Sequence, residues 1–324
     1  MPNLGTKYMN LNLKNPIIVG SSGLTSSVEK VKAAEVAGAG AVVLKSLFEE
    51  VLANESEIES SIPYHPEALD YYQSQLEKEY GARDYIELIK KCKAEIRIPI
   101  IASINCQSAK WWANYTKQIE SAGADAIELN VFTTANNTIV TSRDIEQLHL
   151  DILESVKNVV KIPVSLKIGI YFTSLPNFAV ELDKQGLNGL VIFNRFTEPD
   201  IDINSVELKT SFVFSSSDEI LRTLRWTALL KDKVEFDISA TTGIQNSDDV
   251  IKMLLAGAST VQLVSILYRE GVEKIKDILK GIEEWMTKHN FNSIDEFKGK
   301  LSFARTKTPE HYLRAQFIEK IKSV

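Results

Sequence analysis

The chain has 324 residues, enough to bury the core of one large domain, and its composition is that of an ordinary water-soluble enzyme. A net charge of −6 argues against partners with dense negative charge, such as nucleic acid or an anionic membrane surface. The two cysteines, Cys92 and Cys106, provide neither a disulfide framework nor the thiolates of an iron–sulfur cluster.

Apolar segments of strand type alternate with amphipathic helical segments along the chain. The alternation over residues 8–13, broken by Asn15 and Pro16, predicts a small hairpin that covers a barrel floor. Eight strands are then expected at residues 17–19, 41–44, 98–104, 126–129, 163–167, 190–193, 234–238 and 260–264. Helices are expected from about 27 to 38, up to about 95, and over 109–122, 144–160 and 247–256. This spacing, mostly about 25 to 35 residues from strand to strand, is typical of a (β/α)₈ barrel.

Two long insertions interrupt the alternation, at about residues 48–79 after strand two and 195–219 after strand six. Both follow the carboxyl end of a strand, on the face where such barrels carry their function. Loops of this length are usually lids or binding loops, and His65 in the first of them is expected to stabilise a lid. No linker or change of composition divides the chain. We therefore expect an α/β fold with a single (β/α)₈ TIM-barrel domain over residues 1–324.

Small residues occupy two neighbouring corners of this barrel. Thr241, Thr242 and Gly243 follow strand seven, whereas Val264 and Ser265 follow strand eight. Backbone N–H groups at these corners bind phosphate in many barrels of this class. The alternative is that Gly243 only permits a tight turn.

Polar side chains with hydrogen-bonding or cationic ends occur where successive strands end. They are Lys45, Asn105, Asn130, Lys167 and Asn194. Any one of them has an ordinary explanation as solvated surface. Five on one face, opposite a phosphate corner, predict a binding site.

Several of these segments together resemble the dihydroorotate dehydrogenase family. The resemblance is carried by residues 15–23, Glu128-Leu-Asn130, Ser165-Leu-Lys167, and the segments 242–244 and 256–263. Residues 291–301 are similar to the C-terminal ending of the soluble class 1 enzymes. The resemblance spans nearly the whole chain in the right order and implies a barrel that binds FMN.

The resemblance also implies roles for individual residues. Lys167 matches the lysine beside the N1–C2=O edge of the flavin, where a cation stabilises the negative charge of the reduced ring. The other implied contacts are Ser21 or Ser22, Lys45, Ser46, Asn105 and Asn130 around the ring, Thr242, Gly243, Val264 and Ser265 at the phosphate, and Lys45, Asn130 and Asn194 at the substrate. For Lys45 the flavin and substrate assignments both stay open.

The sequence departs from the family at the catalytic base. Soluble class 1 enzymes carry a cysteine just after the Glu-Leu-Asn motif, and this position falls here on Thr133 or, with a shift of one residue, Thr134. Other branches of the family use serine or threonine there. A hydroxyl needs a neighbour or a water relay to take its proton near neutral pH. Cys106 is a weaker alternative.

Further departures affect the substrate more than the cofactor. Residues 60–66 replace the asparagine- and glycine-bearing substrate loop, and residues 212–218 replace a glycine-rich loop before the seventh helix. The turn at 240–243 has one glycine fewer than the family's usual run. Threonine N–H groups can still face a phosphate there.

Three functions follow from these observations. The first is an FMN-dependent oxidation of dihydroorotate to orotate, a step of pyrimidine biosynthesis, with a soluble acceptor such as fumarate. The second is an FMN reductase or dehydrogenase acting on a different cyclic unsaturated substrate. The third is a flavin-free barrel that binds a phosphorylated metabolite. No ligand spacing indicates a metal site.

The chain start lacks the features of a signal peptide or presequence, and no window approaches the roughly 18 apolar residues of a membrane span. We therefore expect a cytoplasmic protein without a membrane partner. The family resemblance implies a homodimer.

Overall fold

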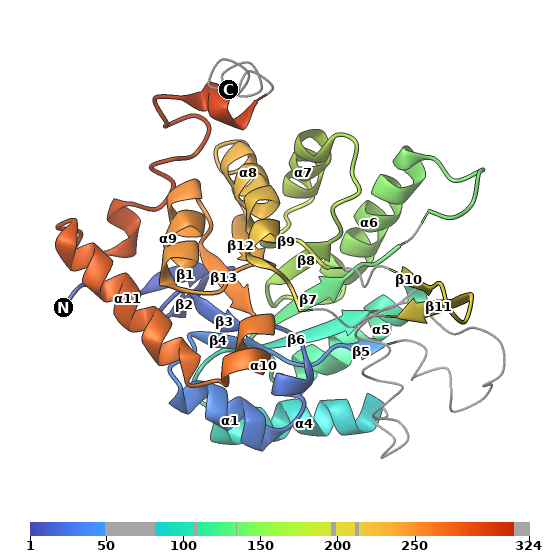
Figure 1. Cartoon of the computed structure of the whole chain (residues 1–324). Coiled ribbons are helices and arrows are strands. Elements are labelled where there is room, and N and C mark those ends of the chain that lie inside the picture. The colour runs from blue at the N-terminus through green and yellow to red at the C-terminus, as the bar shows by residue number, and fades with distance from the viewer. Residues whose placement is uncertain (49–81, 106–108, 134, 196–198, 211–213, 314–324) are drawn as a thin grey trace.

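Short apolar runs whose two faces are both buried form a closed parallel barrel (Figure 1). The computed structural model describes residues 1–48, 82–105, 109–133, 135–195, 199–210 and 214–313. Within them the barrel strands are β3 (Ile17–Val19), β4 (Ala41–Val43), β6 (Ile100–Asn105), β7 (Ala126–Asn130), β8 (Val164–Ile168), β9 (Gly189–Ile192), β12 (Asp237–Thr241) and β13 (Thr260–Leu263). They are hydrogen-bonded in the order β4–β3–β13–β12–β9–β8–β7–β6, and the pairing of β4 with β6 closes the ring. The predicted TIM barrel is confirmed.

Helices surround this barrel on the outside (Figure 1). They are α1 (Val28–Val36), α4 (Ala82–Glu95), α5 (Ala109–Ser121), α6 (Ser142–Lys157), α7 (Leu175–Lys184), α8 (Ile220–Leu230), α9 (Ser247–Ala256), α10 (Ser265–Glu270) and α11 (Lys274–Lys288), with short 3₁₀ turns η1 (Gly23–Thr25), η2 (Ser217–Glu219), η3 (Ile294–Glu296) and η4 (Pro309–Tyr312). Local signals set the boundaries of α9. The Asn246 side chain accepts from the Asp249 N–H at its start, and Gly257 ends it with φ 122°.

The N-terminal hairpin fills the barrel floor, as predicted. Strands β1 (Thr6–Tyr8) and β2 (Leu11–Leu13) pair antiparallel, and Tyr8 and Met9 pack against the first inward-facing residues of the barrel. Gly189, at the start of β9, makes room for them. A Cβ at this position would lie 2.9 Å from Met9 Cγ and 3.0 Å from the Tyr8 hydroxyl, so a side chain here would force the Met9 and Tyr8 side chains to shift.

Above this floor the barrel interior is polar. Gln262 on β13 donates from Nε2 to Oε2 of Glu128 on β7 at 2.6 Å, and both side chains are at most 2% exposed. In the strand order, β13 and β7 lie four strands apart, on opposite walls. This buried hydrogen bond therefore ties the two walls together below the barrel mouth.

Some predicted boundaries were wrong. Strand seven was placed at 234–238, whereas β12 covers Asp237–Thr241, so Thr241 belongs to the strand. Val234 and Phe236 are buried in the core, but they are not part of the strand. Pairing between β12 and β9 starts only at Asp237, which lies opposite Gly189. The chain before the strand is held differently, because the N–H groups of Glu235 and Phe236 donate to the Asp183 carboxylate.

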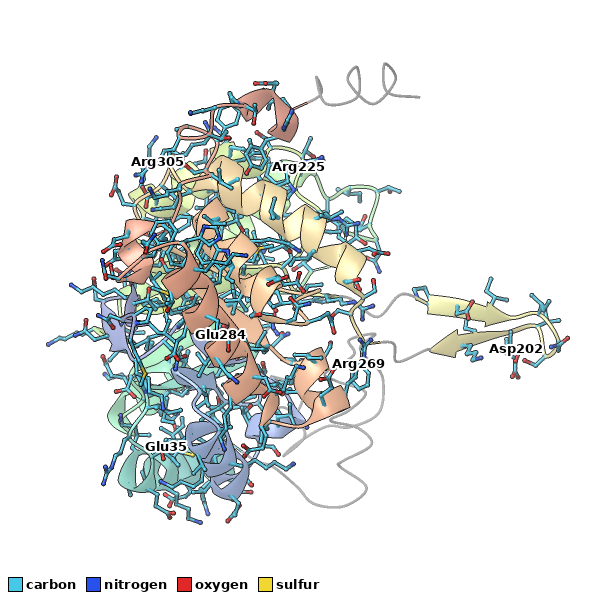
Figure 2. The ribbon with its side chains drawn as sticks, turned by 60° about the vertical axis from the view of Figure 1, so that its left-hand side comes forward. Glu35, Asp202, Arg225, Arg269, Glu284 and Arg305 are labelled. Carbon is cyan, nitrogen blue, oxygen red and sulfur yellow. The ribbon has the colours of Figure 1, made fainter. Side chains whose placement is uncertain are left out.

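Strands that the sequence did not indicate occur at the start of the first insertion and within the second. Strand β5 (Leu47–Phe48) pairs with the end of β6. Strands β10 (Pro199–Asp202) and β11 (Glu207–Thr210) form an antiparallel hairpin within the second insertion. Figure 2 shows this hairpin projecting clear of the barrel, on the side where Arg269 of α10 lies. The remainder of the first insertion, including His65, lies outside the described residues.

Candidate active site

Three buried polar side chains lie at the mouth of the barrel, because side chains along a strand alternate between its two sides. Successive residues of a strand point to opposite sides, so inward-facing positions recur every second residue. Asn105, Asn130 and Lys167 each lie two residues beyond a buried polar residue of their strand. They are 8%, 0% and 6% exposed, respectively. A lysine and two amides are thus largely withdrawn from water where β6, β7 and β8 end.

A fourth predicted residue joins this group directly. Asn194, just beyond β9, is 4% exposed and donates from Nδ2 to Oδ1 of Asn130 at 2.7 Å. Asn130 and Asn194 are 64 residues apart in sequence, and the two predicted substrate amides meet because β7 and β9 both flank β8. The pair presents amide groups of fixed orientation, the kind of group that recognises a ring with carbonyl and N–H edges.

On the other side of the mouth, hydroxyl groups form a buried chain. The Oγ atoms of Ser21 and Ser46 are 2.9 Å apart, and Ser46 Oγ is 2.8 Å from Ser103 Oγ. The Tyr85 hydroxyl anchors the chain from α4, because it donates to the Ser103 carbonyl and accepts from the Ser103 N–H. Burial raises the pKa of this phenol well above its usual range. It therefore remains a neutral donor and acceptor, and it fixes the wall behind Ser46.

Two other predicted residues lie beside this chain. The Ser22 hydroxyl donates to the Gly20 carbonyl and accepts from the Leu24 N–H, so it caps η1. The Lys45 side chain is partly buried, and its backbone N–H donates to the Thr25 carbonyl. Of the alternatives Ser21 and Ser22, only Ser21 bonds to another predicted site residue, Ser46.

The predicted phosphate corner contains a constrained turn. Thr242 and Gly243 both have positive φ, at 75° and 80°, a conformation that is costly for a threonine. Thr242 Oγ1 holds the turn by donating to the Phe193 carbonyl at 3.1 Å. A Cβ at Gly243 would lie 2.5 Å from the Ile220 backbone nitrogen. Glycine is therefore required at 243 both for its conformation and for the close approach of α8.

The neighbouring corner is the start of α10. Val264 is its N-cap and Ser265 its first residue, and the first N–H groups of a helix have no acceptor within the helix. Ser265 Oγ accepts from the Ser215 N–H at 3.2 Å, which brings the segment before α8 against this helix. Arg269 donates to the Phe214 and Ser215 carbonyls and reinforces that contact. Phe214 and Ser215, in the described part of the segment that replaces the family's glycine-rich loop, are thus held on α10.

The candidate base position is only partly described. Thr133 is partly buried and lies three residues beyond Asn130, past the end of β7. Thr134 and the alternative Cys106 lie outside the described residues.

Sequence reasoning missed the residues that support this site. Ser103 lies two residues before Asn105, so strand alternation could have placed it inside the barrel. Tyr85 and the bond between Glu128 and Gln262 had no local signal, because their partners come from distant segments. Arg195 and Glu219, which form an ion pair at 2.8 Å beside Asn194, were likewise not singled out.

A closed parallel barrel surrounded by helices defines an α/β-barrel protein, and its buried polar groups gather at the carboxyl ends of the strands, the face where such barrels carry their active sites. The dihydroorotate dehydrogenase family model matches residues 3–286. The chain therefore belongs to the dihydroorotate dehydrogenase family. Members of this family generally bind FMN.

Individual relatives are distant but cover nearly the whole chain. The catalytic subunit of dihydroorotate dehydrogenase B (NAD(+)) from Methanocaldococcus jannaschii is 26% identical over 309 residues, 91% of this chain and 97% of the relative. The protein of the same name from Methanothermobacter thermautotrophicus is 26% identical over 308 residues, 91% of this chain and 97% of the relative. A putative dihydroorotate dehydrogenase A (fumarate) from Aeropyrum pernix is 24% identical over 224 residues, 68% of this chain and 72% of the relative.

None of the helices within the described residues combines the length and apolar character needed to cross a membrane. No three His, Cys, Asp or Glu side chains in the described ranges gather into a group that could hold a metal ion.

Proposed function

We propose that this protein is an FMN-dependent oxidoreductase that converts dihydroorotate to orotate and passes the electrons to a small soluble acceptor. Family membership and the buried group of Lys167, Asn130 and Asn194 at the barrel mouth support this proposal. The hydrogen bond between the two asparagines is the observation that carries it, because it holds two amides beside a buried cation.

The residues present suit the two ends of FMN. Lys167, Asn105 and Asn130 are buried donors for the polar edge of the flavin ring. At the other end, the turn at Thr242 and Gly243 adjoins the start of α10, because β12 and β13 are hydrogen-bonded neighbours. Positive-φ turns and helix starts offer backbone N–H groups to a phosphate. We therefore assign the ring to Lys167, Asn105 and Asn130, and the phosphate to Gly243 and Ser265.

When bound, FMN supplies an acceptor for the hydride that leaves the substrate. The protein's part is to place the substrate and to remove a proton. Asn130 and Asn194 orient the pyrimidine ring through hydrogen bonds, while Lys167 stabilises the negative charge that develops beside it. The Thr133 hydroxyl accepts the proton from the substrate carbon and passes its own to a neighbour or water, with Thr134 as the alternative.

The electron acceptor is the less constrained part of the proposal. We propose fumarate, on the likeness of residues 291–301 to the soluble class 1 enzymes. The names of the relatives include both fumarate and NAD(+) as acceptors. Steady-state oxidation of dihydroorotate with each acceptor in turn separates them. Faster turnover with NAD(+) than with fumarate contradicts our choice of acceptor but leaves the dihydroorotate half of the reaction standing.

A second candidate function is an FMN enzyme for another cyclic unsaturated substrate, favoured by the altered sequences after strand two, at residues 60–66, and after strand four, where threonine replaces the family's cysteine. Flavin reduction assayed with dihydroorotate and with a panel of dihydropyrimidines, and reoxidation with enones, distinguish the two. Reduction by dihydroorotate at least tenfold faster than by every other donor supports the first. A flavin-free barrel is the third possibility, and a protein that cannot be reconstituted with FMN supports it.

We also propose that the protein is a homodimer that covers the hairpin β10–β11. One side of the hairpin is apolar and exposed, with Ile201 at 62%, Ile203 at 83%, Val206 at 82% and Leu208 at 70%. Ile201 and Leu208 are paired across the strands, whereas Asp200 and Lys209 pair at the next position and so point the other way. Val206 also has φ 57°, unfavourable for a β-branched residue. An uncharged apolar face is complementary to its own copy, and a second chain would cover it.

A further inference from the structure

A pocket that adjoins the phosphate corner, sharing Thr242 with it, opens between the ends of β8, β9 and β12 and the start of α8. Its volume is about 90 Å³, and its lining includes Tyr171, Asn194, Arg195, Glu219, Arg222 and Thr242. The three strands are hydrogen-bonded neighbours, so the pocket lies on one side of the barrel mouth. The phosphate corner lies on the other side of Thr242, between β12 and β13.

The charges around this pocket are unequal. Two arginines and one glutamate line it, which leaves one positive charge. Both oxygens of Glu219 are engaged, because Oε1 accepts from the Ser216 N–H and Oε2 pairs with Arg195 Nε at 2.8 Å. Glu219 therefore neutralises Arg195 and fixes it in place. Arg222 is an exposed residue that lines the pocket, and no salt bridge joins it to an acidic side chain of the described residues.

The two threonine hydroxyls in the lining donate to groups of the protein itself. The Thr223 hydroxyl gives its hydrogen to the Thr241 carbonyl, and the Thr242 hydroxyl gives its hydrogen to the Phe193 carbonyl. Neither hydroxyl is thus available to donate to a ligand. A guanidinium is the group that matches a carboxylate in shape, with two parallel hydrogen bonds.

We propose that this pocket binds the carboxylate group of a small organic acid, held by Arg222. A single net positive charge suits a carboxylate better than a phosphate dianion. A volume of about 90 Å³ corresponds to about three water molecules, enough for a carboxylate and one or two carbons. Because Asn194 lines the pocket and also bonds to Asn130, a ligand there lies beside the proposed substrate amides. That last relation rests on the proposed function, whereas the binding itself does not.

The test uses the purified full-length protein and needs no turnover. Binding of ¹³C-labelled acetate is followed by NMR line broadening at constant ionic strength, and phosphate is titrated separately. Arg222→Gln should weaken acetate binding roughly 10- to 100-fold, the range expected for losing hydrogen bonds to a charged group. Arg222→Lys keeps the charge but loses the paired geometry, so an intermediate loss is expected. Arg225→Gln, on the same helix but outside the pocket lining, is the matched control and should not change the affinity.

Equal acetate affinity in the wild type and Arg222→Gln overturns the proposal, as does phosphate binding that is tighter than acetate binding. Fumarate and dihydroorotate are tested as competitors, because each carries a carboxylate that could occupy the pocket. If either competes with labelled acetate in the wild type and not in Arg222→Gln, the pocket holds that molecule's carboxylate. Far-ultraviolet circular dichroism checks that each variant is folded. The flavin reaction is measured independently by its visible spectrum, so failure of one proposal is distinguishable from failure of the other.

Discussion

At the scale of single residues, the glycine at the proposed phosphate corner is the most constrained position. Gly243 combines a φ of 80° with a backbone contact that leaves no room for a Cβ. Of the two interpretations that the sequence allowed, a tight turn and a phosphate corner, the structure establishes the turn. The phosphate remains our proposal. The two are compatible, because a turn that must hold one shape is already organised for a ligand.

The contact at Gly243 predicts the cost of adding one methyl group. Gly243→Ala should lower the free energy of unfolding by at least about 2 kcal/mol more than Gly186→Ala, because it adds a backbone clash to the same unfavourable conformation. Gly186 has φ 76°, and a Cβ added there would have the flexible end of Lys157, at 3.9 Å, as its nearest neighbour. Gly186→Ala therefore measures the cost of the backbone conformation without a clash. Urea unfolding of both variants gives the difference. Equal losses would show that α8 moves aside without cost.

The sequence predicted which polar residues lie at the ends of the barrel strands, but it did not predict their contacts. The five polar residues at strand ends were predictable because parallel strands of a barrel end on one face. Which of them touch depends on the stagger of the strands and on distant neighbours. The bond between Asn130 and Asn194, and the support of Ser103 by Tyr85, could therefore not be predicted from local pattern.

At the scale of elements, caps and apolar periodicity located helices well, as at α9 between Asn246 and Gly257. Strands were less certain. The apolar run before β12 packs into the core without joining the sheet, because pairing with β9 starts only at Asp237. Strand β5 has two residues, and β10 alternates charged with apolar residues in a segment read as a loop. Short strands of this kind carry little periodic signal.

The interface of α6 and α7 contains a buried histidine that predicts a pH dependence of stability. His149 Nδ1 lies 2.7 Å from the Ile145 carbonyl, and the ring packs edge-on against Phe172 and Phe178. Desolvation lowers the pKa of His149 to about 4. The pKa of a histidine in the unfolded chain is about 6.5, so the unfolded state binds the proton before the folded state does as the pH falls. Stability should therefore decrease as the pH drops from about 6.5 towards 4.

At pH 5 this linkage should amount to a loss of about 2 kcal/mol relative to pH 7.5. Urea unfolding at the two pH values measures it in the wild type and in His149→Gln, where the loss should shrink by that amount. His289, exposed at the end of α11, offers the control substitution His289→Gln. A His149→Gln variant that keeps the full pH dependence would contradict the assignment to this side chain.

At the scale of the whole molecule, the projecting hairpin predicts the oligomeric state. Monomers rarely expose contiguous apolar patches larger than a few hundred Å², and an isolated two-stranded hairpin is at best marginally stable. Substituting Ile203 and Leu208 by aspartate should convert the proposed dimer to a monomer, because each charge would be buried in the contact twice by symmetry. Light scattering coupled to gel filtration gives the mass.

The control places aspartate at Val36 and Val159, which are exposed on the barrel's helical side at 62% and 37%. It should leave the mass unchanged. A wild type that is monomeric at every concentration contradicts the dimer. If the protein is still a dimer after the hairpin substitutions, the dimer contact lies elsewhere and the proposed role of the hairpin is contradicted.

The central claim is that dihydroorotate reduces a flavin bound at this barrel mouth. The bound flavin would carry the redox chemistry, so its spectrum reports the reaction directly. The visible spectrum of the purified protein, reconstituted with FMN if needed, should show the band of oxidised flavin at ~450 nm. Adding dihydroorotate without oxygen should bleach it. Thr133→Ala should slow the bleaching if Thr133 is the base, with Thr134→Ala as the matched alternative. A yellow protein that dihydroorotate leaves unbleached would contradict dihydroorotate as the substrate, and a protein that binds no flavin would contradict the oxidoreductase itself.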